Sequence, residues 1–442
     1  MKISISEHFT YRKLLRFVFP SIIMMIFTSI YCVVDGLFVS NFVGKTPFTA
    51  INLIFPLLMI LGALGFMIGT GGTAIVAKTM GEGQDTKANE YFSMLVYLTA
   101  VCGVLLTVLG LIFLRPVAVL LGAEGEILDC CILYGRVNLI ALPFFMLQNI
   151  FQSFFITAEK PKLGLAVTVA AGVTNMVLDA LFVAVFRWGL FGAALATALS
   201  QFVGGALPVL YFASKNSSRL RLGRASFNGG VFLKTCTNGS SELMSNISAS
   251  VVTMLYNFQL MNFAGDDGVA AYGVIMYVGF IFAAIFIGFS IGSAPIISYH
   301  FGAGNNSELR NMLRKSLVLV SFTGIVMAVT AIAAAGLLSS IFVGYDQALF
   351  DITVRGFTIY AFSYLICGFN IFGSSFFTAL NDGLTSAVIS FLRTLIFQTS
   401  CVIILPIIFK LDGIWFSVIA AELLAFAVTI TFLLFKRKKY NY

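Results

Sequence analysis

Charged residues are scarce in this sequence. Asp, Glu, Lys and Arg account for 10% of its 442 residues, against roughly 25% in an average soluble domain. Hydrophobic residues account for 59%, and the mean hydropathy is +0.98. This composition excludes an ordinary soluble domain and predicts an all-α polytopic membrane protein.

Histidines and enzyme motifs are also scarce. The chain has two histidines, and its seven cysteines, an odd number, show no CxxC spacing. It contains neither an HExxH stretch nor a P-loop. We therefore expect no enzyme, no ATP-driven pump, no cofactor and no metal centre built from His or Cys.

Long apolar runs are what the sequence has instead. About 20 such residues cross a bilayer as a helix, and twelve runs begin near residues 14, 49, 92, 131, 162, 190, 231, 268, 311, 353, 384 and 413. If successive loops alternate sides, 20 of the 27 Lys and Arg face one side and six the other. Such short basic clusters favour topology signals over a nucleic-acid surface. The positive-inside rule then predicts a multi-pass plasma (inner) membrane protein with both termini cytoplasmic, and the first run has no signal-cleavage site.

The two halves of the chain repeat each other. At an offset of 221 residues, NIFQSFFITA (149–158) matches NIFGSSFFTA (370–379) at seven of ten positions, and GEG (81–83) matches GAG (302–304). The repeat predicts two homologous six-helix bundles. An even number of spans relates them by a pseudo-two-fold axis along the membrane normal, as in parallel-repeat transporters that move about a central site.

The bundles are assigned as two lobes. We expect an N-terminal lobe at residues 1–213, a basic cytoplasmic linker at 214–230 and a C-terminal lobe at 231–442.

Four acidic residues lie inside apolar runs: Asp35, Asp179, Glu242 and Glu422. A charge at the bilayer centre costs about 2.5–3.5 kcal/mol on insertion scales, so such residues face the bundle interior and are functional candidates. Glu242 stands near the cytoplasmic end of its run, where substrate contact at a cavity mouth and interfacial solvation are both open. Arg393 lies on the helix next to that of Glu422, and we expect a structural ion pair between them.

Asn175 and Asp179 share one helix face, because they are four positions apart. The hairpin that follows returns Thr197 to a similar depth, and Asp35 lies in the same half of the membrane. Two carboxylates with amide and hydroxyl oxygens suit a hard cation such as Na⁺, or a carboxyl pair that shares one proton. The sequence therefore predicts a cation or proton site; the alternative is polar residues that hold helices together.

The repeat places this site in one lobe. Asp35 aligns with Tyr256, and Asp179 aligns with Ser400 in a run that has no acid. We therefore expect ion chemistry in the N-terminal lobe, and take Tyr256 and Glu242 as candidate substrate contacts.

Several stretches together resemble the multidrug and toxic compound extrusion (MATE) family of antiporters, bacterial branch. They are the spacing of Pro20 and Asp35, TAEKPK (157–162), and NMVLD (175–179) followed by GLFGAALAT (189–197). With the twelve spans and the duplication, the resemblance covers almost the whole chain.

The resemblance implies a V-shaped pair of six-helix bundles that exports cationic or amphiphilic small molecules in exchange for inward H⁺ or Na⁺. The family's cation-site and bending residues match this sequence at Asp35, Asn175, Asp179, Thr197 and Pro20, with a further contributor at Asn149 or Gln152. The only metal expected is Na⁺ at Asp35, Asn175 and Asp179. Some members carry an ion-coupling acid in the tenth helix, but residues 356–379 contain none, which leaves Glu242 as a weak substitute.

One alternative function is a lipid-linked oligosaccharide flippase of the same superfamily. Its pyrophosphate substrate would require several buried arginines, whereas the spans hold more acids than bases. We therefore expect a secondary active multidrug exporter that works by alternating access of two lobes, without a nucleic-acid partner or an obligate protein partner.

Overall fold

The computed structural model describes residues 3–344 and 346–442, and all regular elements in these ranges are helical. In chain order they are α1 (Tyr11–Phe38), η1 (Val39–Val43), α2 (Lys45–Gly81), α3 (Asp85–Leu120), α4 (Gly125–Thr157), α5 (Pro161–Asp179), η2 (Ala180–Val185), α6 (Gly189–Ala213), α7 (Gly229–Gly302), α8 (Asn306–Val343), α9 (Gln347–Ala361), α10 (Tyr364–Ala379), α11 (Gly383–Phe391), η3 (Leu392–Phe397), α12 (Gln398–Phe435) and α13 (Arg437–Tyr440). The three η elements are π-helices.

The helices of the described residues form twelve membrane spans. Nine helical segments are long and apolar enough to cross a membrane, and the bent pair α9 and α10 makes a tenth. Two of the ten segments each contain two spans, which gives twelve. Helix α7 has 74 residues, which would be about 110 Å long if straight, and its backbone leaves the helical region at Gly265. The segment Gly383–Phe435 has the same kind of break at Lys410 of α12.

The tenth span differs from the unbroken run that its sequence predicts. Its two helices, α9 and α10, are bent by 50° relative to each other. At the break, the amides of Phe362 and Ser363 bond to carbonyls three residues earlier. Such tight turns do not continue the α-helical ladder, so the chain changes direction.

The repeat is visible in the backbone turns. A positive φ requires glycine or strain at a turn, and it occurs at equivalent places in both halves. Three pairs of such residues are 221 positions apart: Gly44 and Gly265, Gly83 and Gly304, Gly189 and Lys410.

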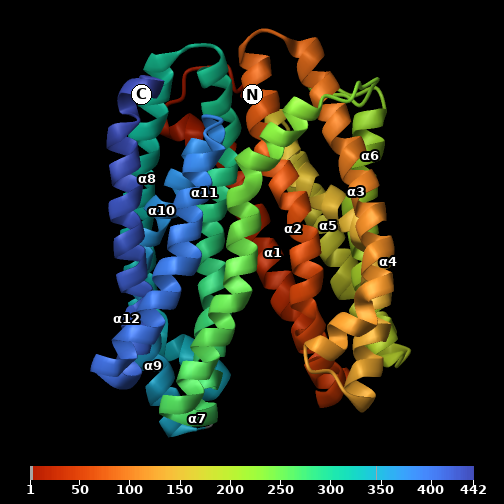
Figure 1. Ribbon diagram of the computed structural model, residues 1–442, viewed down its shortest axis with the longest axis vertical. Helices are drawn as coiled ribbons and strands as arrows, with labels where there is room; N and C mark the ends of the chain where they lie inside the picture. The colour runs from red at the N-terminus through yellow and green to blue at the C-terminus, as the bar shows by residue number, and fades with distance from the viewer. Residues whose placement is uncertain (1–2, 345) are drawn as a thin grey trace.

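Figure 1 shows two bundles side by side, with α1–α6 in red to yellow-green and α7–α12 in green to blue. Both chain ends, and the extended segment between α6 and α7, lie at the same end of the molecule. We call this the terminal end. Its assignment to the cytoplasm stays a prediction.

Glycines let the bundles meet closely at the terminal end. A Cβ added to Gly81, the last residue of α2, would lie 2.0 Å from the Tyr299 carbonyl oxygen of α7. A Cβ added to Gly302 would lie 2.0 Å from the Lys78 carbonyl oxygen. Gly81 and Gly302 are themselves 221 positions apart, so this contact is close to self-symmetric between the lobes.

The segment before α1 also contacts both lobes. Glu159, between α4 and α5, accepts a hydrogen bond from the Ile5 amide (3.2 Å). Glu308, in the first turn of α8, accepts one from the Phe9 amide (2.9 Å). Ile5 and Phe9 are fully buried, so residues 3–10 join the lobes across the terminal end.

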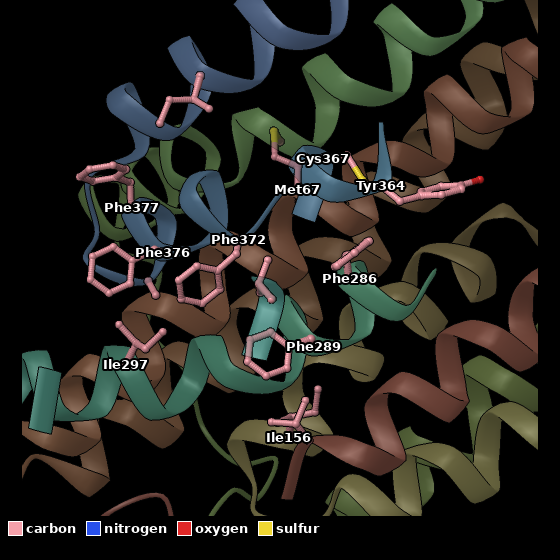
Figure 2. Close-up of a cluster of buried hydrophobic side chains, with 14 of the residues drawn as sticks. Met67, Ile156, Phe286, Phe289, Ile297, Tyr364, Cys367, Phe372, Phe376 and Phe377 are labelled. Atoms are coloured by element: carbon pink, nitrogen blue, oxygen red, sulfur yellow. The ribbon is translucent and has the colours of Figure 1, made fainter. Parts of the chain in front are cut away.

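Buried apolar side chains continue from one lobe into the other. Figure 2 shows one group of them, in which Phe289 of α7 lies near Phe372 of α10, and Phe372 lies near Phe376. The Phe289 and Phe372 ring centroids are 6.0 Å apart. Met67 of α2 belongs to the same group, so the N-terminal lobe contributes to this core.

Candidate functional site

Helices α1 and α5 bring the predicted cation-site residues together. Phe27 and Tyr31 of α1 pack on Gly172 of α5, where an added Cβ would lie 2.5 Å from Phe27 Cε1 and 3.0 Å from Tyr31 Cδ1. Both helices start at the terminal end. One to two turns further along, Asp35 on the same face of α1 therefore meets Asp179 on the same face of α5.

Asp35, Asn175 and Asp179 form what we call the N-lobe acidic site. Asp35 interacts electrostatically with both Asp179 and Asn175. Asp179 is 0% exposed and Asn175 is 2% exposed. Among the described residues, no hydrogen-bond partner is found for either Asp179 oxygen, for the Asn175 amide atoms or for Asp35 Oδ1. The salt bridges in the described ranges all lie elsewhere.

Thr197 lies at the level of this site on α6. Gly192 packs against Phe182, because an added Cβ would lie 3.1 Å from Phe182 Cβ, and counting along the antiparallel hairpin places Thr197 beside residues 177–179. The Thr197 hydroxyl donates to the Ala193 carbonyl (3.1 Å). Its oxygen lone pairs therefore remain available as acceptors.

Asn149 and Gln152 both lie buried on α4, but at different depths. Gln152 lines a small space with Thr168 of α5. Thr168 precedes Asn175 by seven residues and so lies about 10 Å closer to the terminal end. Asn149 is almost one turn nearer to the acidic site, and its amide nitrogen has no hydrogen-bond partner among the described residues. Asn149 is therefore nearer to the acidic site in depth, whereas Gln152 lies on the side of α4 that faces α5 and α6.

Helix α1 also touches the C-terminal lobe, next to Pro20. Pro20 lies inside α1, which is continuous over Tyr11–Phe38. A Cβ added to Gly288 of α7 would lie 2.6 Å from Ile22 Cα and 2.8 Å from the Ser21 carbonyl oxygen. The Pro20 region is thus held against α7, while the Asp35 region is held against α5.

Gly288 also begins the stretch GFSIG (288–292), which has the GxSxG spacing of a hydrolase nucleophile elbow. That elbow needs a sharp strand-to-helix turn. Here the stretch lies inside α7, and a Cβ added to Gly292 would lie 2.6 Å from Val18 Cγ1 of α1. The two glycines therefore serve helix packing.

The structure brings Arg393 and Glu422 together in the C-terminal lobe. Arg393 Nε lies 2.9 and 3.0 Å from the two Glu422 oxygens, and Nη2 lies 2.8 Å from Oε1. Asn370 donates to Glu422 Oε2 (2.6 Å) and in turn accepts from Thr429 (3.1 Å). Sequence reasoning missed Asn370, although it aligns with Asn149 at the repeat offset.

Arg393 and Asp179 share an unusual backbone setting. Arg393 lies inside the π-helix η3, and Asp179 directly precedes the π-helix η2. Single π-helical turns inside longer helices occur frequently at functional sites.

A cavity of about 330 Å³ lies between the lobes. Thr70 and Thr73 of α2 line it from the N-terminal lobe, and Glu242 and Arg393 line it from the C-terminal lobe. Glu242 is half-buried, and no salt bridge to it is found in the described part of the chain.

Tyr256, the other candidate substrate contact, lies away from this cavity. It is 1% exposed, stacks on Tyr272 with centroids 5.1 Å apart, and donates to Gln398 Oε1 (2.9 Å). The structure thus brings Glu242 to the cavity and leaves Tyr256 inside the C-terminal lobe.

Two repeated six-helix lobes with a cavity between them define the class of polytopic membrane proteins built from parallel repeats. Within this class the chain belongs to the MatE family, whose model matches residues 20–181 and 243–403. One matched segment lies in each half of the chain. The resemblance seen in the sequence is therefore confirmed.

Similar curated proteins include the multidrug export protein MepA of Staphylococcus saprophyticus. It is 22% identical over 428 residues, which cover 95% of this chain and 93% of that protein. MepA of Staphylococcus haemolyticus is 24% identical over 332 residues, or 75% and 73% of the two chains.

Solved structures with the same fold include a multidrug resistance MATE family transporter in an outward-facing conformation. The TM-score is 0.92 at 20% identity, over 99% of this chain and 97% of that chain. A MOP superfamily transporter from Pyrococcus furiosus Vc1 gives 0.90 at 20% identity, with the same coverage. The predicted fold class of two six-helix bundles is thereby confirmed.

Proposed function

We propose that this protein is a secondary active exporter of cationic or amphiphilic small molecules, driven by inward movement of H⁺ or Na⁺. The observation that carries the proposal is the N-lobe acidic site, with two neighbouring carboxyl groups inside the spans and no neutralising side chain among the described residues. The names of the MepA relatives support the export of drugs.

The acidic site suits ion coupling because two like charges repel strongly in a protein interior. At an effective dielectric constant of 20, two unit charges 4 Å apart interact by about 4 kcal/mol. A proton or Na⁺ removes this repulsion, and the oxygens of Asn175 and Thr197, at a similar level on α5 and α6, would supply further ligands.

Helix α1 connects the acidic site to the arrangement of the lobes. Asp35 sits where α1 meets α5, and Ile22 sits where α1 meets α7. An ion that binds Asp35 and Asp179 better in one position of α1 favours that position. A bend of α1 at Pro20 would move the Asp35 region relative to the Ile22 region and so change the position of α1. A ligand shifts such an equilibrium only through its different affinity for the two states.

The test is efflux of ethidium from proteoliposomes under an imposed Na⁺ or H⁺ gradient. We expect gradient-dependent efflux by the wild type and a loss of at least about tenfold in Asp179→Asn, since roughly 1.4 kcal/mol of lost ion binding suffices. Glu126→Gln is the matched control, because Glu126 is exposed at the start of α4. Full gradient dependence in both Asp35→Asn and Asp179→Asn would refute the assignment of the coupling site.

The flippase alternative is tested by the same preparation. Arg393 lines the cavity, but its charge is compensated by Glu422, which is a poor match for a pyrophosphate group. No ethidium efflux under either gradient, together with translocation of a lipid-linked oligosaccharide, would favour the flippase.

A further inference from the structure

The linker between α6 and α7 is bound along one face of α3. The Asn89 side chain accepts a hydrogen bond from the Arg221 amide (2.7 Å). Ser93 accepts one from the Gly223 amide (3.0 Å), and the Tyr97 hydroxyl donates to the Gly223 carbonyl (2.9 Å). Asn89, Ser93 and Tyr97 are spaced four residues apart and so lie in one row on the helix surface. The linker therefore holds a fixed position on α3 at the terminal end (Figure 1).

Two arginines of the linker carry unpaired positive charge. Residues 214–230 contain four Lys and Arg and neither Asp nor Glu. The charge of Arg219 is compensated by Asp85, at 3.0 Å. Arg221 and Arg224 are exposed, and no salt bridge to either is found in the described part of the chain.

Arg221 and Arg224 line a pocket of about 530 Å³ at the terminal end, and α3 forms its opposite wall with Thr86 and Glu90. Glu90 is the one acidic residue among the described residues that line this pocket. Guanidinium groups bind phosphate oxygens through charge-assisted hydrogen bonds in a planar fork. The pocket therefore suits a phosphate group, and Glu90 works against it.

An apolar groove continues from this basic pocket. It has a volume of about 370 Å³ and lies between α3, α4 and α6, and Leu222 of the linker lines both spaces. Phe144 and Phe202 pack edge to face in its wall, with centroids 4.7 Å apart. Tyr97, Phe202 and Leu210 are 46, 49 and 65% exposed, so the groove opens to the outside of the lobe, where lipid lies.

The length of the groove matches one leaflet of a bilayer. Leu210 and Phe202 are eight residues apart on α6, or about 12 Å, and the hydrocarbon of one leaflet is about 15 Å thick. The basic pocket lies at the end of the groove where the helices leave the membrane. A soluble anion would use the pocket alone, whereas a phospholipid fits the pocket and the groove together.

We propose that the N-terminal lobe binds one anionic phospholipid at this place. The lipid phosphate lies at Arg221 and Arg224, and one acyl chain lies in the groove between α3, α4 and α6. The site is separate from the N-lobe acidic site and from the cavity between the lobes, so it does not depend on the proposed export function.

The experiment compares two lipids that differ in head-group charge. Phosphatidylglycerol is anionic and phosphatidylcholine is zwitterionic, and both are used with dioleoyl chains. Binding of the first lipid molecule to the full chain in detergent is measured by native mass spectrometry. The wild type should bind phosphatidylglycerol roughly tenfold or more tightly than phosphatidylcholine, because each basic residue near an anionic head group adds to the attraction.

Charge variants assign this preference to residues. Arg221→Gln/Arg224→Gln should lose the preference for phosphatidylglycerol, while Glu90→Gln should strengthen it. Arg12→Gln/Arg314→Gln is the matched control, because it removes the same charge from exposed positions near the same end of the molecule. This control should keep the preference.

Groove variants test the acyl chain. Ala206→Trp fills the groove, and Phe202→Ala removes part of its wall. Both should weaken the two lipids to a similar extent and leave the preference for phosphatidylglycerol in place. Glycerol 3-phosphate, which has the phosphate without the chains, should not displace the lipid at millimolar concentration.

Four results would overturn the inference. They are equal binding of the two lipids by the wild type, an equal loss of preference in the control variant, unchanged lipid binding in both groove variants, and displacement of the lipid by glycerol 3-phosphate. The last result would show a site for soluble anions and not for a phospholipid.

Discussion

Gly239→Ala should weaken the contact between the lobes at the terminal end. A Cβ at this position of α7 would lie 1.8 Å from the Met67 carbonyl oxygen of α2. An ordinary carbon–oxygen contact of this kind is about 3.3 Å, so the two helices must separate by roughly 1.5 Å. Because the obstacle is a backbone atom, no side-chain rotation relieves the clash.

The free-energy cost of this substitution falls on one arrangement of the lobes. Overpacking a tight contact costs typically about 1–3 kcal/mol, and it applies only while Gly239 and Met67 touch. The gain in helix propensity from glycine to alanine, up to about 1 kcal/mol, applies equally when the lobes are apart. The equilibrium should therefore shift about 5- to 150-fold toward lobes that are separated at the terminal end.

The assay is a distance measurement by pulsed electron paramagnetic resonance. Spin labels at Lys87 and Ser307, which are exposed near the starts of α3 and α8, report the separation of the lobes in a variant whose native cysteines are replaced. We expect a larger long-distance population in Gly239→Ala. Gly336→Ala is the matched control, because an added Cβ there meets nothing within 4 Å.

Unchanged distance distributions in Gly239→Ala would refute the reasoning. So would the same shift in Gly336→Ala, since that result would trace the effect to helix propensity and not to the contact with α2.

Two further predictions concern ion pairs. Arg393→Gln alone leaves Glu422 buried and uncompensated, so it should lower the free energy of unfolding by about 3–5 kcal/mol. The double variant Arg393→Gln/Glu422→Gln should lose clearly less stability. Equal losses of stability in thermal unfolding would contradict this. At the terminal end, burial of Asp382 disfavours its charge, but hydrogen bonds from Lys436 (2.7 Å) and Tyr440 (2.8 Å) outweigh burial and lower the pKa of Asp382. A lowered pKa stabilises the fold above the ordinary Asp pKa of about 3.9, and this contribution disappears as the pH falls through the folded-state value. Hydrogen exchange of residues 436–442, corrected for its intrinsic pH dependence, should therefore stay slow at pH 7. Lys436→Ala should move the onset of fast exchange to higher pH. An onset near neutral pH in the wild type would count against a stabilising contact between Asp382 and Lys436.

The positions of most spans could be predicted because the bilayer imposes a length and a composition on each one. The runs expected near residues 162, 190 and 231 begin at Pro161, Gly189 and Gly229, where proline or glycine ends the preceding segment. The break between α9 and α10 could not be predicted, because no proline or glycine occupies positions 362–363.

The acidic site was partly predictable for a similar reason. Asn175 and Asp179 share a face through their spacing alone, and Asp35 joins them because α1 packs on α5 at Gly172. Tyr256 shows the limit of such reasoning: its alignment with Asp35 suggested a ligand contact, yet its ring stacks inside the lobe on Tyr272.

The twelve spans, the duplication and the placement of the paired acids in one lobe follow from the amino-acid order alone, because hydropathy, repeat offset and helical spacing are properties of that order. Three features come from helix packing instead: Asn370 binds Glu422, Arg393 and Glu242 line one cavity, and Gly239 touches α2. These features depend on how each helix is rotated and how closely it approaches its neighbour. Both are set by side-chain packing across the lobes, which no single run of the sequence contains.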